Sequence, residues 1–183
     1  GHNIVSTQAG QMTHSDTWGP FMNALYYTGC RYAVVFKDDY SRLVFFVFCK
    51  DRTTTTLLEA YKLYAAFMRS HGVELSGTWV SDGGPEYVSR EAYDFCDDHA
   101  LQRLLSVRYT PQQNGGAESA FLVHVPRARA ALRSGGLPKQ AWALALQYSA
   151  WLSNRTQSKR LGCAPLQRLP NPPALDLHHA RPM

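Results

Sequence analysis

The stretch Thr78-Trp-Val-Ser-Asp-Gly-Gly-Pro85 joins a short apolar run to an acidic residue and an abrupt chain break. Its first residues predict a short buried strand, which Gly83, Gly84 and Pro85 end directly after Asp82. Strands of an α/β sheet present ligands beyond their carboxyl ends. The stretch therefore predicts a central strand that holds Asp82 at the edge of an α/β sheet.

Three β-rich segments precede this strand. A first strand is expected from Met12 to the break at Gly19-Pro20, and two apolar runs follow at 32–36 and 43–48. The connector Lys37-Asp-Asp-Tyr-Ser-Arg42 has the polar composition of a hairpin turn. These three segments therefore predict an antiparallel meander.

Helices and strands alternate over the rest of the predicted domain. Added to the meander, they predict an α/β fold in which a mixed five-stranded sheet carries helices on both faces. The further expected elements are helices over 53–71, 89–99, 117–134 and 138–154, and a strand over 101–107.

The segment before the third helix is expected to be a loop, because residues 109–116 contain a proline and two adjacent glycines. Inside that helix, Pro126 lacks a backbone N–H and its ring clashes with the preceding turn. We therefore expect the helix to kink or restart near residues 122–126.

The length of 183 residues fits one ordinary domain. We divide the chain into a lead-in over 1–11, a core over 12–160 and a proline-rich tail over 161–183. The composition, 45% hydrophobic and 18% charged, argues against a disordered chain, and the formal charge of +5 favours an anionic partner.

The cysteines indicate the compartment. Their wide spacing matches no zinc site, so we interpret Cys30, Cys49, Cys96 and Cys163 as thiols in a reducing, intracellular compartment. The sequence contains neither a cationic-then-apolar leader nor an apolar run of about 18 residues. We therefore expect neither secretion nor a membrane span.

Three acidic residues stand where a metal site would need them. Asp16 closes the first predicted strand, Asp82 closes the central one, and Glu118 lies in the first turn of a helix after the loop. Two-metal phosphoryl transfer needs several hard oxygen ligands that converge on one point. A single strand-end aspartate would favour a structural role, but the three together favour a metal site.

Other polar residues receive a structural interpretation. Asp38 and Asp39 lie in the hairpin turn, where aspartate caps its own backbone. His124 lies in the apolar run at 121–125 and is interpreted as a hydrogen-bonded core histidine. That run is expected either to join the core or to face a partner subunit. A solvated helix face accounts for Asp94, Asp97 and Asp98.

Five motifs occur in a fixed order along residues 11–165. They are Thr13-His-Ser-Asp16 with Trp18-Gly-Pro20, Asp38-Asp-Tyr-Ser-Arg42, Ser81-Asp-Gly-Gly-Pro-Glu-Tyr87, Tyr109-Thr-Pro-Gln-Gln-Asn-Gly115 before Ala117-Glu118, and Gly136-Leu-Pro138 with Trp142 and Asn154-Arg155. Together they resemble the integrase catalytic core of copia-type LTR retrotransposons, within the retroviral integrase superfamily. The 35 residues between Asp82 and Glu118 match the Asp, Asp-35-Glu signature of that superfamily.

The resemblance implies a ribonuclease H-like fold and an enzyme that joins retroelement DNA ends to target DNA after 3′ end processing. It implies Asp16, Asp82 and Glu118 as catalytic ligands of two Mg²⁺ or Mn²⁺ ions. It further implies DNA as partner, a homo-oligomer of two or more subunits, and action in the nucleus. The loop residues expected to contact DNA are Gln112, Gln113, Asn114 and Gly115.

The chain departs from the family pattern beyond the glutamate. Ser119 and Phe121 stand where copia-type relatives commonly carry Arg and Asn, and Leu122 and Val125 stand where retroviral cores carry basic residues. Gly83 replaces an asparagine that usually follows the second aspartate. These departures leave an alternative function open, namely a domesticated and catalytically inactive core that binds nucleic acid or protein. A related ribonuclease H-like nuclease or transposase is a second enzymatic alternative.

Overall fold

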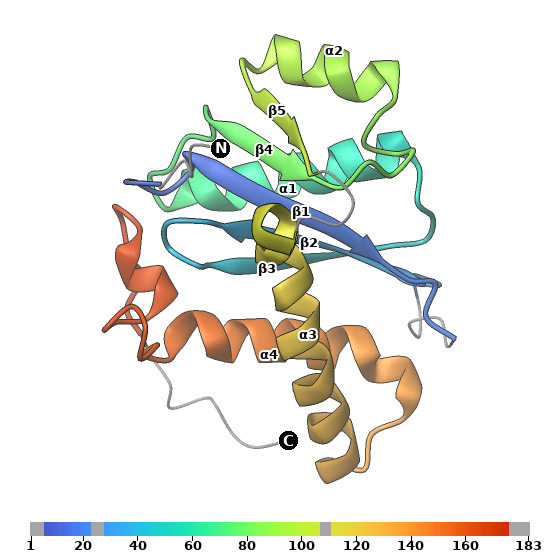
Figure 1. The fold of residues 1–183 in the computed structure, drawn as a ribbon. Coiled ribbons are helices and arrows are strands. Elements are labelled where there is room, and N and C mark those ends of the chain that lie inside the picture. Colours follow the sequence, from blue (N-terminus) through green and yellow to red (C-terminus); the bar gives the residue numbers. More distant parts are fainter. Residues whose placement is uncertain (1–5, 23–27, 107–110, 176–183) are drawn as a thin grey trace.

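The computed structural model describes residues 6–22, 28–106 and 111–175, and for residues 111–115 it describes the backbone alone. A five-stranded sheet lies between two layers of helices (Figure 1). The sheet order is β3-β2-β1-β4-β5. The strands are β1 (Met12–Trp18), β2 (Tyr32–Asp38), β3 (Val44–Cys49), β4 (Thr78–Ser81) and β5 (Gln102–Leu105).

The sheet is mixed, as the sequence predicts. Strands β1, β2 and β3 form an antiparallel meander, whereas β4 pairs in parallel with both β1 and β5. The short strand β4, predicted from the stretch at 78–85, therefore lies inside the sheet, with β1 on one side and β5 on the other. The predicted fold class is confirmed.

Four α-helices cover the sheet. Helices α1 and α2 lie on one face, and α3 and α4 lie on the other (Figure 1). Thr53 and Ser89 cap α1 and α2, because each side chain accepts a hydrogen bond from a backbone N–H of the first turn. The helices are α1 (Thr54–Ser70), α2 (Arg90–Asp98), α3 (Pro111–Ser134) and α4 (Trp142–Arg155), with short 3-10 helices η1 (Lys139–Ala141) and η2 (Pro165–Arg168).

The two faces have separate apolar cores. On the α1 side, Tyr64 is fully buried and stacks on Phe36 with ring centroids 5.0 Å apart. On the α3 side, Phe46 packs against Phe121 with centroids 5.6 Å apart. Burying one such side chain stabilises the fold by about 1.5–3 kcal/mol. Phe121 thus belongs to the core, one of the two roles left open for its segment.

Helix α3 corrects two expectations. It begins at Pro111, so residues 111–116, expected to be a loop, are helical. Proline suits a first helical turn because its missing N–H has no partner there in any helix. The helix also continues through Pro126 as one element to Ser134. Pro126 lacks the N–H that would bond to the Leu122 carbonyl, and both residues lie on the exposed side of the helix.

The hairpin between β2 and β3 confirms the structural interpretation of Asp38. Its fully buried carboxylate accepts hydrogen bonds from the Ser41 N–H at 2.7 Å and from the Gly10 N–H at 2.8 Å. Arg42 follows with a φ of 64° and closes the turn. The turn is thereby tied to the lead-in as well as to itself.

Residues 161–175 pack against the domain. Leu166 and Leu169, in and after η2, are buried in the core on the α1 side. Arg168 donates a hydrogen bond to the Tyr40 carbonyl at 2.7 Å and places its guanidinium 3.8 Å from the centre of the Tyr40 ring. All four cysteines carry free thiols. Among the described helices, none has the length and apolar character that a membrane span requires.

Candidate active site

Asp16 and Asp82 come from adjacent parallel strands. The register of β1 and β4 pairs Met12 with Thr78 and His14 with Val80. The same offset carries Asp16, inside β1, to the level of Asp82, directly after β4. The sequence analysis placed Asp16 at the end of its strand, whereas β1 continues for two residues beyond it.

The electrostatics of Asp16 show that carboxylates gather here. Burial, then the negative charge of Asp82 and that of Glu118, raise the pKa of Asp16 to about 6. Arg52 opposes this shift, and so does the Thr17 N–H, which donates to Asp16 Oδ1 at 2.8 Å. The negative charges outweigh the nearby cation. A bound cation would relieve this excess of negative charge.

The loop after Asp82 is built around an ion pair whose acidic partner is buried. Arg52, in the connection from β3 to α1, donates a short hydrogen bond to Glu86, whose side chain is 2% exposed. Gly84 lies between these groups, because a Cβ there would be 2.9 Å from Arg52 Nη2 and 3.0 Å from Asp82 Oδ1. The Gly84 N–H donates to Asp82 Oδ1 at 3.0 Å. A side chain at Gly84 would force the end of a neighbouring side chain to shift, so glycine favours the close packing beside Asp82.

Two further hydrogen bonds join the aspartate-bearing segments. Trp79 Nε1, in β4, donates to Ser15 Oγ in β1 at 2.7 Å. The Tyr87 hydroxyl, in the loop after Asp82, lies 3.1 Å from Thr17 Oγ1. Both aromatic side chains are buried. They fix the two strands and the loop on either side of Asp16.

The start of α3 is held against β1 and β2. A Cβ on Gly116 would lie 2.6 Å from the His14 ring, so the helix backbone lies directly on that histidine. Lys37 Nζ donates to the Gly116 carbonyl at 3.0 Å and to Ser119 Oγ at 2.9 Å. Glu118 lies between these two anchored residues. The sheet thereby positions the helix turn that carries Glu118.

The third carboxylate does not complete a preformed metal group. Glu118 is exposed on α3, although its charge acts on Asp16. Within the described ranges, no three His, Cys, Asp or Glu side chains are close enough together to hold one metal ion. The assignment of Asp16, Asp82 and Glu118 as ligands therefore stays a prediction.

Sequence reasoning missed several residues of this site. Arg52 and His14 carried no signal of a role beyond their positions, since the partners that define them are distant in sequence. Glu86 and Tyr87 lie inside the quoted motif but received no function. The predicted DNA contacts Gln112, Gln113, Asn114 and Gly115 fall outside the described side chains and stay predictions.

The sequence of this chain is similar to those of known proteins. The integrase core domain family matches residues 6–111, a segment that holds Asp16 and Asp82 and ends before Glu118. A retrovirus-related Pol polyprotein from transposon TNT 1-94 of Nicotiana tabacum is 35% identical over 148 residues, which are 80% of this chain and 11% of that protein. A truncated transposon Ty1-A Gag-Pol polyprotein of Saccharomyces cerevisiae is 23% identical over 150 residues, 82% of this chain and 12% of that protein.

Solved structures share the fold. A chain of the simian T-cell lymphotropic virus intasome in complex with PP2A regulatory subunit B56 gamma superimposes with a TM-score of 0.75 at 20% identity. That match covers 96% of this chain and 59% of the other. The HTLV-2 integrase catalytic core domain in complex with magnesium, in its trimeric form, gives 0.68 at 17% identity over 89% of this chain and 98% of the other.

The fold and the family match define the class of protein, a ribonuclease H-like integrase core. This chain belongs to the integrase core domain family. Its transposon relatives confirm the resemblance to copia-type elements. The chain spans about a tenth of the length of those Pol polyproteins.

The residues present fit a divalent cation. Asp16 and Asp82 would supply hard oxygen ligands from adjacent strands, and burial together with the charges of Asp82 and Glu118 raises the pKa of Asp16. Mg²⁺ is typically held by one or two protein carboxylates and keeps several waters. Two carboxylates on adjacent strands would therefore be sufficient to begin such a site.

Proposed function

We propose that this chain is an integrase catalytic core that carries out divalent-metal-dependent strand transfer and 3′ end processing of retroelement DNA. The observation that carries the proposal is the alignment of Asp16 and Asp82 on adjacent parallel strands, with the charge of Glu118 acting on Asp16. Membership of the integrase core domain family supports the same chemistry.

We assign the metal ligands to Asp16, Asp82 and Glu118, with Mg²⁺ or Mn²⁺ as the ion. Two such ions supply the charge that activates a nucleophile and stabilises a leaving oxygen. The protein side chains position them: β1 and β4 hold the two aspartates, and α3 brings Glu118 from an exposed position. In this proposal, a small movement of the first turns of α3 completes the ligand set.

The partners follow from the same proposal. DNA is the substrate, in the form of element ends and target, and Gln112, Gln113, Asn114 and Gly115 contact it at the start of α3. The core acts in the nucleus as a homo-oligomer. The dimeric and trimeric forms of the HTLV-2 core support an oligomer.

Strand transfer with a pre-processed donor end tests the function. Asp82→Asn keeps the shape of the side chain but removes its charge, so the variant should fold and should not join DNA in Mg²⁺ or Mn²⁺. Asp94→Asn, on the exposed face of α2, is the matched control and should join DNA as the wild type does. Equal joining by wild type and Asp82→Asn would refute the assignment.

A second candidate is an inactive core retained as a binding module. The observation in its favour is that Glu118 lies exposed and completes no group of three ligands among the described residues. This candidate predicts that divalent metal leaves the melting temperature unchanged, because nothing binds the ion. The enzymatic proposal predicts a metal-dependent rise that is much smaller in Asp82→Asn.

A further inference from the structure

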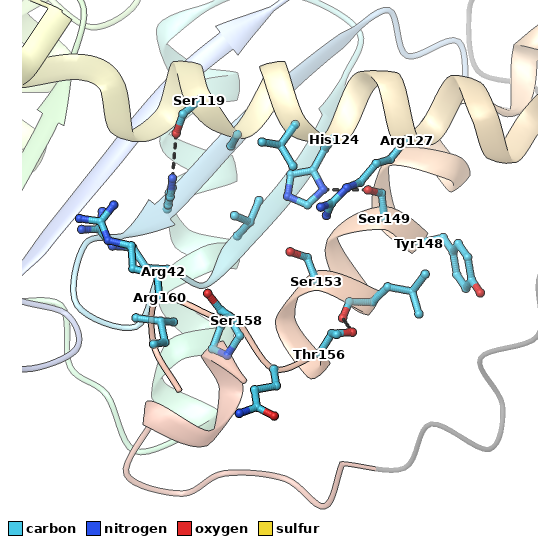
Figure 2. A pocket seen from close by; sticks show the side chains of 18 of the residues that line it. Arg42, Ser119, His124, Arg127, Tyr148, Ser149, Ser153, Thr156, Ser158 and Arg160 are labelled. Atoms are coloured by element: carbon cyan, nitrogen blue, oxygen red, sulfur yellow. Dashed lines mark hydrogen bonds between the residues drawn. The ribbon is translucent and has the colours of Figure 1, made fainter. Parts of the chain in front are cut away.

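A hollow lies beside α3, away from Asp16 and Asp82. It has a volume of about 640 Å³, within the range of small-ligand sites. Its walls come from α3, α4, the β2–β3 hairpin and the segment that follows α4 (Figure 2). Ser119 points into it and is joined to Lys37, which ties this hollow to the helix turn that carries Glu118. We call it the α3–α4 pocket.

Four cations and no carboxylate are among the residues that line the α3–α4 pocket. Arg42 has a partner, Asp39, at 3.1 Å. Lys37, Arg127 and Arg160 make no ion pair within the described part of the chain. The pocket therefore carries positive charge that the protein itself does not neutralise.

The ionisable groups of the pocket respond to that charge. Burial, and then repulsion from Arg42 and Arg160, lower the pKa of Lys37 to about 8. His124 lies at the pocket wall and is 2% exposed. Burial, and then the charges of Arg127 and Lys37, lower the pKa of His124 to about 4. An anion in the pocket would relieve the repulsion between the positive charges, though not the effect of burial.

Hydroxyl groups complete the lining. His124 Nδ1 lies 2.8 Å from Ser149 Oγ, and Lys37 Nζ donates to Ser119 Oγ. Phosphate oxygens accept hydrogen bonds from guanidinium, ammonium and hydroxyl groups, and this combination recurs at DNA-backbone contacts. The hydroxyl-bearing residues that line the pocket are Ser119, Tyr148, Ser149, Ser153, Thr156 and Ser158.

We propose that the α3–α4 pocket binds phosphate groups of the DNA backbone, held by Arg127, Arg160 and the hydroxyls between them. The inference rests on the proposed function, because it takes DNA as the partner. It also accounts for how this core holds DNA although Leu122 and Val125 stand at the positions where retroviral cores carry basic residues. One of its cations, Arg127, lies on that same helix.

The salt dependence of DNA binding tests this inference. Binding of a fluorescein-labelled DNA duplex is measured by anisotropy at several KCl concentrations, in EDTA so that metal chemistry plays no part. Each lost phosphate contact reduces the slope of log K against log[salt] by about 0.9. Arg127→Gln and Arg160→Gln should each show this reduction, and Arg127→Lys should restore the slope. Both arginines are exposed, so their replacement leaves the core intact.

Two further variants sharpen the test. Arg90→Gln removes an exposed arginine on α2, on the opposite face of the sheet, and should leave the slope as in the wild type. Ser153→Asp adds a carboxylate to the pocket and should weaken DNA binding several-fold at low salt. Competition with inorganic phosphate distinguishes a pocket for free phosphate from a pocket for the DNA backbone. If the pocket binds the backbone, phosphate releases the duplex only at concentrations at which KCl also does so.

The outcomes separate this inference from the proposed function. Wild-type binding with equal slopes in Arg127→Gln and Arg90→Gln would overturn the pocket assignment and leave the proposed function standing. The same result would follow if the pocket bound an acidic protein segment instead. Absence of DNA binding by the wild type would overturn both. Loss of slope together with inactivity in Mg²⁺ would support the pocket and contradict the enzyme.

Discussion

Asp82 stands beside Asp16 across two parallel strands, one position past the last residue of β4. The relationship arises from the sheet order, since β1 is the strand at which antiparallel pairing changes to parallel pairing. It places the two carboxylates at the same level of neighbouring strands. Burial, and then the negative charges of Asp82 and Glu118, raise the pKa of Asp16 to about 6.

Asp16→Asn should stabilise the metal-free protein at neutral pH. The pKa of Asp16 is about 6 in the fold, above its ordinary 3.8, so its ionised form opposes folding at pH 7. Asparagine still accepts the Thr17 N–H. We expect the free energy of unfolding at pH 7 to rise by about 1–2 kcal/mol, after a discount for partial exposure. Urea unfolding in EDTA measures it.

Asp39→Asn is the matched control, and it should change the free energy of unfolding in the opposite direction. Hydrogen bonding to His14 is the main cause that lowers the pKa of Asp39 to about 2, and Arg42 adds to it. The stability that Asp39 contributes is therefore present above its ordinary pKa of 3.8 and lost only in stronger acid. Asp39→Asn should be less stable than the wild type at pH 7. If Asp16→Asn were also less stable than the wild type, this would contradict the claim that the ionised Asp16 carboxylate opposes folding.

Arg52→Gln should destabilise the protein more than Glu86→Gln does. Removing the guanidinium leaves the 2% exposed Glu86 carboxylate buried without a counter-charge, whereas Glu86→Gln removes the buried charge itself. Because Arg52 is itself partly exposed, we expect a loss of about 1–3 kcal/mol. Thermal unfolding of the two variants ranks them. The reverse order would mean that the ion pair does not hold the loop after Asp82.

Much of the fold could be predicted because its signals are local. Strand and helix periods and breaks such as Gly83-Gly84 act within a few residues. The start of α3 could not be predicted, since its proline and glycines are local loop signals and its contact with His14 joins residues far apart in sequence. The packing of Leu166 in the core had no local signal either.

The candidate site divides in the same way. Predicted strand ends and a predicted helix start singled out Asp16, Asp82 and Glu118 together, and the resemblance added their spacing. The Arg52–Glu86 pair and the cations of the α3–α4 pocket are brought together only by the tertiary fold. The periodicity of a sequence gives no information about such contacts between elements that are distant along the chain.

Gly116→Ala should impair activity while Gly83→Ala should not. A Cβ on Gly116 meets the His14 ring at 2.6 Å, so the start of α3 must shift, which outweighs the usual helix-stabilising effect of alanine. We expect a loss of about 1–3 kcal/mol in stability and a clear fall in DNA joining. At Gly83 no atom lies within 4 Å of a built Cβ. Unfolding and strand-transfer assays on both variants check this.

Acid should destabilise the protein through His124. Its pKa is about 4 in the fold, below the ordinary 6.5, so the unfolded chain binds a proton that the fold does not. Stability is therefore lost as pH falls from about 6.5 towards 4, by about 2 kcal/mol between pH 7 and pH 5. The Asp16→Asn background removes the opposing effect of that carboxylate. His124→Gln in this background should show a much smaller loss; an equal loss would assign the acid sensitivity elsewhere.

The central claim is that Asp16, Asp82 and Glu118 act together on DNA, and Glu118 is the residue that the fold leaves exposed. Disintegration of a pre-joined DNA branch tests it most directly, because this reaction makes the smallest demand on segments beyond the core. The measurement is cleavage of the branch in Mn²⁺ by the wild type and by Glu118→Gln. The account predicts cleavage by the wild type and none by the variant. Cleavage by both would show that Glu118 is not a ligand, and cleavage by neither would contradict catalysis by this core.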